Sequence, residues 1–347
     1  MWFRDNENHK KRLFFASDIH GSVVGFKKFL NALKFYKADI LVYGGDLTGK
    51  AIVPIVKEGD HYVTSSYGNT IKLNSETDVK DFQNTLINKG FYPVVMTREE
   101  YTELQNNPQA LHKKFSELMY ERINFWKQLA EERLMPEHKK LYWQAGNDDL
   151  LDIDDVLNGE STVNIGDRIT QIDDYYVLGL TYVNVTPWNT YRDISEEEMK
   201  DAIDGQLKEL NELGENSRVA AEEKIKEVIR RETTQVENAE NVIMVYHAPP
   251  YNTSLDLAPR ITEDMTYAKV GGQPDIIHVG STSVREAIED VQPLLSLHGH
   301  IHESKGAEKI GKTLCLNPGS EYSEGILHGA LINLDGNKVK SYIFTSG

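Results

Sequence analysis

Short apolar segments that stop abruptly at acidic, amide or imidazole side chains are the feature that most limits what this chain can fold into. Residues 12–17 are mostly apolar and lead into Asp18 and His20, and residues 40–43 are followed, after two glycines, by Asp46. The apolar spacing between these segments predicts a helix. Because ligands in α/β sheets gather at the carboxyl ends of strands, this strand–helix–strand order predicts an α/β protein with a binding site there.

Three later segments end in the same way. They lead into Gly146-Asn147-Asp148-Asp149, into His247, and into His298-Gly299-His300-Ile301-His302. Alternate side chains of an extended strand share a face, so His300 and His302 point the same way. An isolated pair of this kind is more often structural than metal-binding. The other four strand ends favour the metal-binding interpretation.

These strand ends carry carboxylates, an amide and imidazoles, which are ligands of divalent metals. The single cysteine, Cys315, excludes an internal disulfide and a thiolate cluster, so any metal must use oxygen and nitrogen ligands. Two ions about 3.5–4 Å apart suit such a set, because a paired site stabilises both the attacking and the leaving oxygen of an in-line displacement.

Length and charge limit the other classes of function. The chain has 347 residues, which fits one large α/β domain with insertions or two average domains. Its net charge of −16 argues against general nucleic-acid binding, which needs a basic surface. No apolar run reaches the roughly eighteen residues that a membrane span needs. The first ten residues are polar and charged overall and lack the apolar core of a signal peptide, so we expect a cytoplasmic protein without a membrane partner.

Two stretches interrupt the strand pattern and are predicted to be insertions in a single domain that spans residues 1–347. Residues 51–139 predict a hairpin that turns at Gly68-Asn69 and is followed by amphipathic helices. Residues 192–240 predict a charged helical hairpin that is broken near Gly214. Because specificity often resides in segments added to a rigid scaffold, we interpret both insertions as candidate caps over the site.

In their order along the chain, the strand ends resemble the calcineurin-like metallophosphoesterase superfamily. The family motifs D-x-H, G-D, G-N-H-D/E, a lone histidine and G-H-x-H correspond to Asp18-Ile19-His20, Gly45-Asp46, Gly146-Asn147-Asp148-Asp149, His247 and Gly299-His300-Ile301-His302. Within the superfamily, the chain is most similar to the Icc-related prokaryotic phosphoesterases, through the segments that begin at His247, His278 and Asn317. The resemblance covers about 12–50, 141–191 and 241–335.

The resemblance implies a four-layer α-β-β-α sandwich of two mixed sheets, with a dinuclear metal centre. It places Asp18, His20 and His302 on one divalent ion, Asn147, His247 and His300 on the other, and Asp46 between the two. The family uses manganese, iron, nickel or zinc, and mixed oxygen and nitrogen ligands do not choose among them. The implied reaction is hydrolysis of a small phosphodiester or phosphomonoester by a metal-bridging hydroxide.

Four positions need separate interpretation. Many family members have a phosphate-contacting histidine where this chain has Asp148, so Asp148 is a candidate catalytic residue, able to act as an acid only if its pKa is raised. His298 and His278 lie outside the motifs and are expected to be structural or to orient a metal ligand. Gly49 stands where purple acid phosphatases have a metal-binding tyrosine, so that subgroup is not predicted.

Two alternatives to a phosphatase or phosphodiesterase of small substrates are considered. A nuclease can use the same fold, although the acidic charge and the lack of an aromatic and basic tract argue against it. A non-catalytic protein-binding scaffold would show degenerate ligands, whereas here the set is complete apart from Asp148. The sequence leaves the substrate, the identity of the metals and the oligomeric state open.

Overall fold

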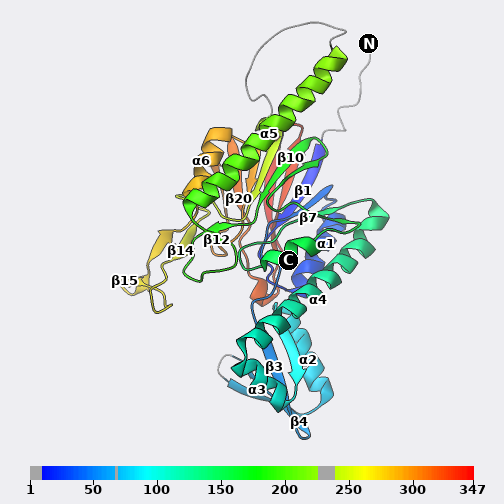
Figure 1. Ribbon diagram of the computed structural model, residues 1–347, viewed down its shortest axis with the longest axis vertical. Coiled ribbons are helices and arrows are strands. Elements are labelled where there is room, and N and C mark those ends of the chain that lie inside the picture. The colour runs from blue at the N-terminus through cyan, green and yellow to red at the C-terminus, as the bar shows by residue number, and fades with distance from the viewer. Residues whose placement is uncertain (1–9, 67–68, 226–238) are drawn as a thin grey trace.

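Two six-stranded mixed sheets form the body of the protein in a computed structural model that describes residues 10–66, 69–225 and 239–347 (Figure 1). In spatial order, the first sheet contains β22 (Lys338–Ser346), β21 (His328–Asp335), β1 (Lys10–Ala16), β2 (Ile40–Tyr43), β7 (Leu141–Trp143) and β8 (Thr162–Asn164). The second contains β19 (Gly306–Ile310), β20 (Thr313–Asn317), β18 (Leu295–Leu297), β13 (Val242–Tyr246), β10 (Tyr175–Leu180) and β9 (Ile169–Ile172). The predicted α/β class with mixed sheets is confirmed.

The central strands are apolar on both faces because each face packs against a different partner. In β1, Leu13 and Phe15 belong to a core shared with the second sheet, whereas Phe14 and Ala16 belong to a core shared with helices. The alternation follows from the two-residue period of a strand. β1, β2 and β7 run parallel, as do β10, β13, β18 and β20, so their carboxyl ends lie at one edge of each sheet.

Helices pack against the other face of each sheet. α1 (Val23–Phe35) and α4 (Pro108–Leu134) pack against the first sheet, where Phe26 stacks on Trp126 with ring centroids 4.4 Å apart. α5 (Glu196–Ile225) and α6 (Thr282–Val291) pack against the second sheet through residues that include Met199 and Ile288. Ser22 caps α1 by accepting a hydrogen bond from the Gly25 backbone, and the loop of candidate ligands is thereby held against the start of this helix.

The first insertion forms a small α/β lobe, seen at the lower end of Figure 1. Its sheet has the order β5 (Asn69–Leu73), β4 (His61–Ser66), β3 (Ile52–Glu58) and β6 (Tyr92–Met96), with α2 (Glu76–Asn88) and α3 (Arg98–Asn106) beside it. The predicted hairpin corresponds to β4 and β5, and its turn lies partly outside the described residues. The prediction of a hairpin plus helices was incomplete, because it missed the parallel pair of β3 and β6.

The second insertion differs from its prediction at Gly214. The backbone of α5 continues through this position, so the predicted break there is wrong. A single glycine costs a helix only about 1 kcal/mol relative to alanine, which is too little to end a long helix. The helix begins with a capping box in which Ser195 and Glu198 bond each other's backbone N–H groups. The predicted second arm begins after Gly214; up to Ile225 it continues α5, and residues 226–238 lie outside the described residues.

The remaining elements are short. They are the 3-10 helices η1 (Met135–Glu137), η2 (Leu151–Val156), η3 (Ala239–Asn241) and η4 (Tyr322–Glu324), and the strand pairs β11 (Val183–Asn184) with β12 (Asp193–Ile194), β14 (Leu257–Pro259) with β17 (Ile276–His278), and β15 (Lys269–Val270) with β16 (Gln273–Pro274). Within the described residues, every helix is too short or too polar to cross a bilayer.

Candidate metal centre

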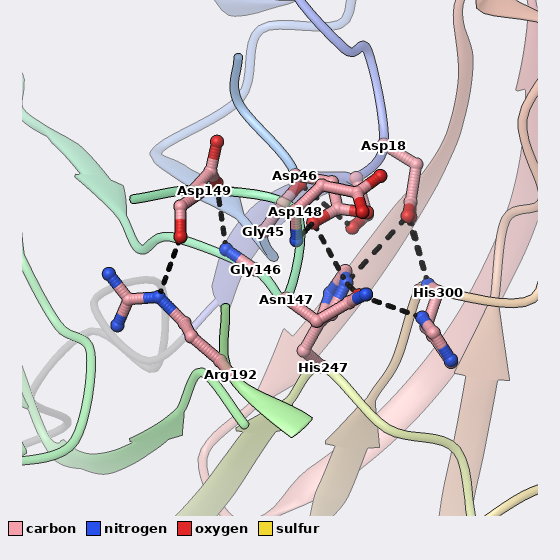
Figure 2. A network of polar contacts seen from close by, with 12 residues as sticks. Asp18, Gly45, Asp46, Gly146, Asn147, Asp148, Asp149, Arg192, His247 and His300 are labelled. Carbon is pink, nitrogen blue, oxygen red and sulfur yellow. Dashed lines mark hydrogen bonds and ion pairs between the residues drawn. The ribbon is translucent and has the colours of Figure 1, made fainter. Parts of the chain in front are cut away.

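The predicted ligands meet where the carboxyl ends of the two sheets come together (Figure 2). Hydrogen bonds between the loops fix this meeting point. The backbone N–H of Asp18 donates to the Gly45 carbonyl at 3.0 Å within the first sheet, and that of Gly299 donates to the His247 carbonyl at 3.2 Å within the second. The His300 N–H donates to Asp18 Oδ1 at 3.0 Å, which joins the two sheets at the site.

The first ligand group contains Asp18, His20, Asp46 and His302. One ligand atom from each lies within 4.8 Å of the others. The Nε2 atoms of His20 and His302 are 3.0 Å apart, and His20 Nε2 lies 3.5 Å from Asp46 Oδ2. Three of these side chains are buried and His302 is partly exposed. The structure therefore places one carboxylate-rich, imidazole-rich pocket at the position that the sequence predicts.

The second group contains Asp46, His247 and His300, again within 4.8 Å of one another. Asn147 completes it, with Oδ1 at 3.1 Å from His247 Nε2 and 2.9 Å from His300 Nδ1. Asp46 belongs to both groups, and its Oδ1 lies 3.4 Å from His247 Nε2. All seven predicted ligands are thus brought together in the predicted two groups, while their binding of ions stays a prediction.

Four of these ligands have left-handed backbone conformations. The φ angles are 58° at Asp18, 40° at His20, 53° at Asp46 and 65° at His300. A residue with a Cβ adopts this region at a cost of about 1–2 kcal/mol. Such strained positions cluster at functional sites, where the surrounding structure holds them. The loops are therefore shaped to aim side chains at a common point rather than for their own stability.

Two motif glycines allow the loops to approach the ligands closely. A Cβ on Gly146 would lie 2.3 Å from Asp46 Oδ1 and 2.7 Å from His247 Nε2. A Cβ on Gly299 would lie 2.2 Å from Asp18 Oδ2. All three distances are far below van der Waals contact, so a side chain at either position would displace the ligands. The glycines thus keep the space between the ligand atoms clear.

Electrostatics favour a cation in this space. Burial opposes ionisation of Asp18, but hydrogen bonding from His302 and the charge of His247 lower the Asp18 pKa to about 2. Burial would lower the pKa of His247, but Asp46 and Asp18 raise it to about 9. Burial and the His247 charge lower the pKa of His300 to about 4. The ionised carboxylates therefore hold a proton on His247 beside the neutral His300, and a divalent ion that displaces this proton would find mixed oxygen and nitrogen donors.

Asp148 lies beside the ligands and is paired with Lys50, which the sequence analysis missed. The Asp148 N–H donates to Asp46 Oδ1 at 3.0 Å, and Asp148 Oδ2 lies 2.8 Å from Lys50 Nζ. Burial and Asp46 raise the pKa of Asp148 to about 6, against the opposing effect of Lys50. Burial alone would lower the Lys50 pKa, but Asp148 and Asp46 raise it overall. In the sequence, the only sign of this ion pair is that a lysine follows Asp46 by four residues.

The two histidines outside the motifs have different places. His298 is fully buried, and its Nδ1 lies 2.9 Å from the carbonyl oxygens of both Tyr246 and Ala248, the neighbours of His247. It therefore holds the backbone on both sides of His247, and its role in orienting this predicted ligand stays a prediction. His278 instead contacts Asp256, with Nδ1 2.7 Å from Oδ1, and belongs to neither ligand group of the described residues.

Several supporting residues received no role in the sequence analysis. The buried Asp149 carboxylate accepts hydrogen bonds from the backbone of Leu47 at 2.9 Å and of Gly146 at 2.8 Å, which ties the Asp46 loop to the Asn147 loop (Figure 2). Arg192 is buried and donates to the carbonyl of Asp149 at 3.3 Å. Thr190 Oγ1 accepts a hydrogen bond from Asn147 Nδ2 at 2.8 Å. Asp149 could have been inferred from its place in the motif, whereas nothing in the sequence singles out Thr190.

A cavity of about 360 Å³ opens beside the ligands. Its lining residues are Asp46, Lys50, Asn147, Asp148, Trp188, Ala258, Pro259, Ile261, Tyr267, His300, Ile301, His302 and Glu303. Among the described parts of 51–139 and 192–240, no residue lines this cavity. Beyond the candidate ligands and residues near them in the sequence, the cavity wall comes from Trp188 and from residues within 258–267, a segment that begins in β14. A capping role of the insertions stays a prediction.

Comparisons with known proteins identify similar chains. No family model matches the sequence. An uncharacterized protein of Methanocaldococcus jannaschii is 29% identical over 198 residues, which cover 56% of this chain and 70% of that protein. One crystal structure aligns with 95% of this chain and 98% of its own length, with a TM-score of 0.50 and 13% identity. The structure of a novel archaeal phosphodiesterase aligns with 97% of this chain and 99% of its own length, with a TM-score of 0.30 and 12% identity.

Proposed function

We propose that this chain is a metal-dependent phosphoesterase of the calcineurin-like metallophosphoesterase superfamily with a dinuclear metal centre. The observation that carries the proposal is the meeting of seven side chains from five strand ends in two groups that share Asp46. The order of the motifs along the chain supports the same class. The core shared by the two sheets and the helical cores on their other faces support the superfamily's four-layer α-β-β-α sandwich.

Each ligand group would hold one divalent ion. Asp18, His20 and His302 would hold the first and Asn147, His247 and His300 the second, with Asp46 contributing to both. When bound, such ions supply Lewis acidity and a nucleophile derived from water near neutral pH. The chain supplies the orientation of these ligands, because its left-handed loops and close-packed glycines fix them before any ion binds.

Asp148 and Lys50 would replace the phosphate-contacting histidine of the family. Both line the cavity, and their ion pair of 2.8 Å keeps the Lys50 ammonium beside Asp46. We propose that Lys50 donates a hydrogen bond to a phosphoryl oxygen, because it is the lysine of the described cavity lining. Asp148 would position Lys50 and would hold a proton for the leaving oxygen of the ester.

The proposed substrate is a small phosphodiester or phosphomonoester. The cavity volume of about 360 Å³ lies at the lower end of the range for small-molecule sites. The net charge of −16 disfavours a nuclease. We propose Mn²⁺ as the ion for a first assay. We also propose that the protein is cytoplasmic.

The test is hydrolysis of p-nitrophenyl phosphate and bis-p-nitrophenyl phosphate by purified protein with Mn²⁺, Fe²⁺, Ni²⁺ or Zn²⁺. We expect hydrolysis by the wild type and its loss in Asp46→Asn, with fewer ions bound per chain by elemental analysis. Asp173→Asn is the matched control, because this carboxylate is half-exposed and pairs with Lys11 away from the site. Inactivity with every ion, or the absence of stoichiometric metal, would refute the proposal and favour the scaffold alternative.

A further inference from the structure

Part of the lining of the cavity beside the ligand groups is apolar and plays no part in the proposed chemistry. It consists of Trp188 and Tyr267, each with 57% of its surface exposed, together with Ala258, Pro259 and Ile261. Exposed apolar side chains that gather in a concave surface mark ligand-binding sites, whereas scattered ones do not. We therefore expect the cavity to bind a ligand with an apolar part.

The loop that carries Trp188 is anchored to a predicted metal ligand. The Trp188 N–H donates to Thr186 Oγ1 at 3.3 Å, and the Thr186 N–H donates to Asp193 Oδ2 at 2.8 Å. Thr190 donates to the other oxygen of Asp193 and accepts from Asn147 Nδ2 at 2.8 Å. A single hydrogen-bonded loop thus connects the backbone of Trp188 with Asn147, which fixes the position of this residue relative to the candidate metal centre.

Tyr267 stands on an equally well-bonded element. β14 and β17 pair antiparallel, and their hydrogen bonding continues outward through the Arg260 N–H to the Asp275 carbonyl at 2.8 Å. An isolated bridge joins Ile261 with Tyr267. In Figure 1 this yellow segment, with β14 and β15, projects from the side of the second sheet. Both aromatic residues therefore stand on hydrogen-bonded backbone, which limits the entropy lost when a ligand stacks on them.

The lining of the cavity combines two kinds of chemistry. Asp46, Asn147 and His300 belong to the groups that would hold ions and a phosphoryl group, with Lys50 beside them. The apolar part of the lining offers aromatic faces and aliphatic side chains. A free phosphate would leave the aromatic faces in contact with water. A ligand that satisfies both parts joins a phosphoryl group to a planar apolar group.

We propose, resting on the proposed phosphoesterase function, that the substrate is a phosphoester with a planar aromatic substituent, which stacks on Trp188 and Tyr267. The aromatic group is either the base of a nucleotide or an aryl group esterified directly to phosphorus. Stacking on a protein aromatic ring is worth roughly tenfold or more in affinity per ring. Selectivity for such substrates is then set by these two residues, outside the ligand groups.

The first experiment measures binding and needs no turnover. Phenylphosphonate and methylphosphonate are titrated into the Mn²⁺-loaded protein by calorimetry. We expect phenylphosphonate to bind about tenfold more tightly, and Trp188→Ala and Tyr267→Ala to remove most of this preference. Trp188→Tyr and Tyr267→Phe should keep it, because a ring remains. Equal affinity of the two phosphonates for the wild type would overturn the inference.

Matched controls separate stacking from changes in the fold. Tyr191→Ala alters an aromatic residue of the Trp188 loop that does not line the cavity, and Val270→Ala alters an exposed residue on the Tyr267 element. Both control variants should keep the preference for phenylphosphonate. If the controls lose it together with Trp188→Ala, the effect comes from disruption of these segments and the inference fails.

The second experiment measures turnover with a constant leaving group. p-Nitrophenyl phenylphosphonate is compared with p-nitrophenyl methylphosphonate, and p-nitrophenyl thymidine 5′-phosphate with ethyl p-nitrophenyl phosphate. A higher kcat/KM for the phenyl ester supports an aryl substrate, and one for the thymidine ester supports a nucleotide. Equal kcat/KM within both pairs overturns the inference while the phosphoesterase function stands. No turnover with a retained binding preference refutes the phosphoesterase function and leaves the aromatic site supported.

Discussion

Replacement of His300 by glycine should give a more stable metal-free protein than replacement by alanine. Both changes remove the imidazole, so comparing the two variants cancels the loss of its contacts. Alanine retains a Cβ at a φ of 65°, at a cost of about 1–2 kcal/mol. Glycine avoids that cost but gains about 0.5–1 kcal/mol of conformational freedom in the unfolded chain. The variant with glycine should therefore be more stable by about 0.5–1 kcal/mol.

The control for this comparison is Gly205, in the interior of α5. A Cβ there would meet no atom within 4 Å, and the helical backbone favours alanine. Gly205→Ala should therefore stabilise the protein by about 0.5–1 kcal/mol, so that alanine and glycine rank in the opposite order at the two positions. Urea unfolding in the presence of a chelator gives each difference in the free energy of unfolding from the shift of the midpoint, when the m-value is unchanged. If alanine is the more stable residue at position 300 as well, the strain assigned to the ligand loops is absent.

Three further predictions concern single side chains. Thr190→Val removes the hydroxyl that accepts from Asn147 and should weaken Mn²⁺ binding about 10–100-fold by calorimetry, whereas Thr190→Ser should not. Burial raises the pKa of Cys315 to about 12, so at pH 8 its thiol should resist alkylation in the folded protein and react only in urea, as mass spectrometry will show. Asp148→Asn should slow hydrolysis of alkyl phosphodiesters about 10²-fold and of aryl phosphodiesters much less, because only alkoxide leaving groups need a proton; equal losses would exclude a leaving-group role.

The sequence predicts which side chains meet at the candidate site because each of them follows a buried strand. Apolar runs define the strands, and parallel pairing places residues such as Asp18 and Asp46 at one edge whatever the rest of the chain does. The chemistry of the residues then limits what the edge can bind. The apolar pattern of the strands and the rule that ligands bind at the carboxyl ends of parallel strands are therefore enough to predict this meeting.

The parts that the sequence did not predict depend on contacts between distant segments. β3 and β6 are separated by a hairpin and a helix, and their pairing leaves no alternating pattern strong enough to read. Lys50 and Thr190 are ordinary polar residues until the fold places them beside Asp148 and Asn147. Trp188 and Tyr267 likewise line one cavity only because the fold brings two segments that are distant in the sequence to its wall.

Bound ions should stabilise the body of the protein but leave the outer hairpin of the first insertion unchanged. The first ligand group takes Asp18 from the first sheet and His302 from the loop after β18 of the second, so an ion there connects the two sheets. The hairpin of β4 and β5 packs in a separate core, which includes Leu73, and the insertion contributes no ligand within the described residues. An ion at 100 times its dissociation constant adds about 2.7 kcal/mol to the stability of the state that binds it.

Amide hydrogen exchange with and without a chelator measures this difference. Removal of metal should speed exchange in β1, β2, β13 and β18 by up to about 100-fold, while exchange in the hairpin of β4 and β5 stays within experimental error. Only the first set of strands is connected by the ligand groups. Opening of the hairpin in the insertion depends instead on its own core. Equal acceleration in both sets would mean that the insertion unfolds together with the sheets. Unchanged exchange in β1 and β18 would mean that the ligand groups bind no ion strongly enough to connect the sheets.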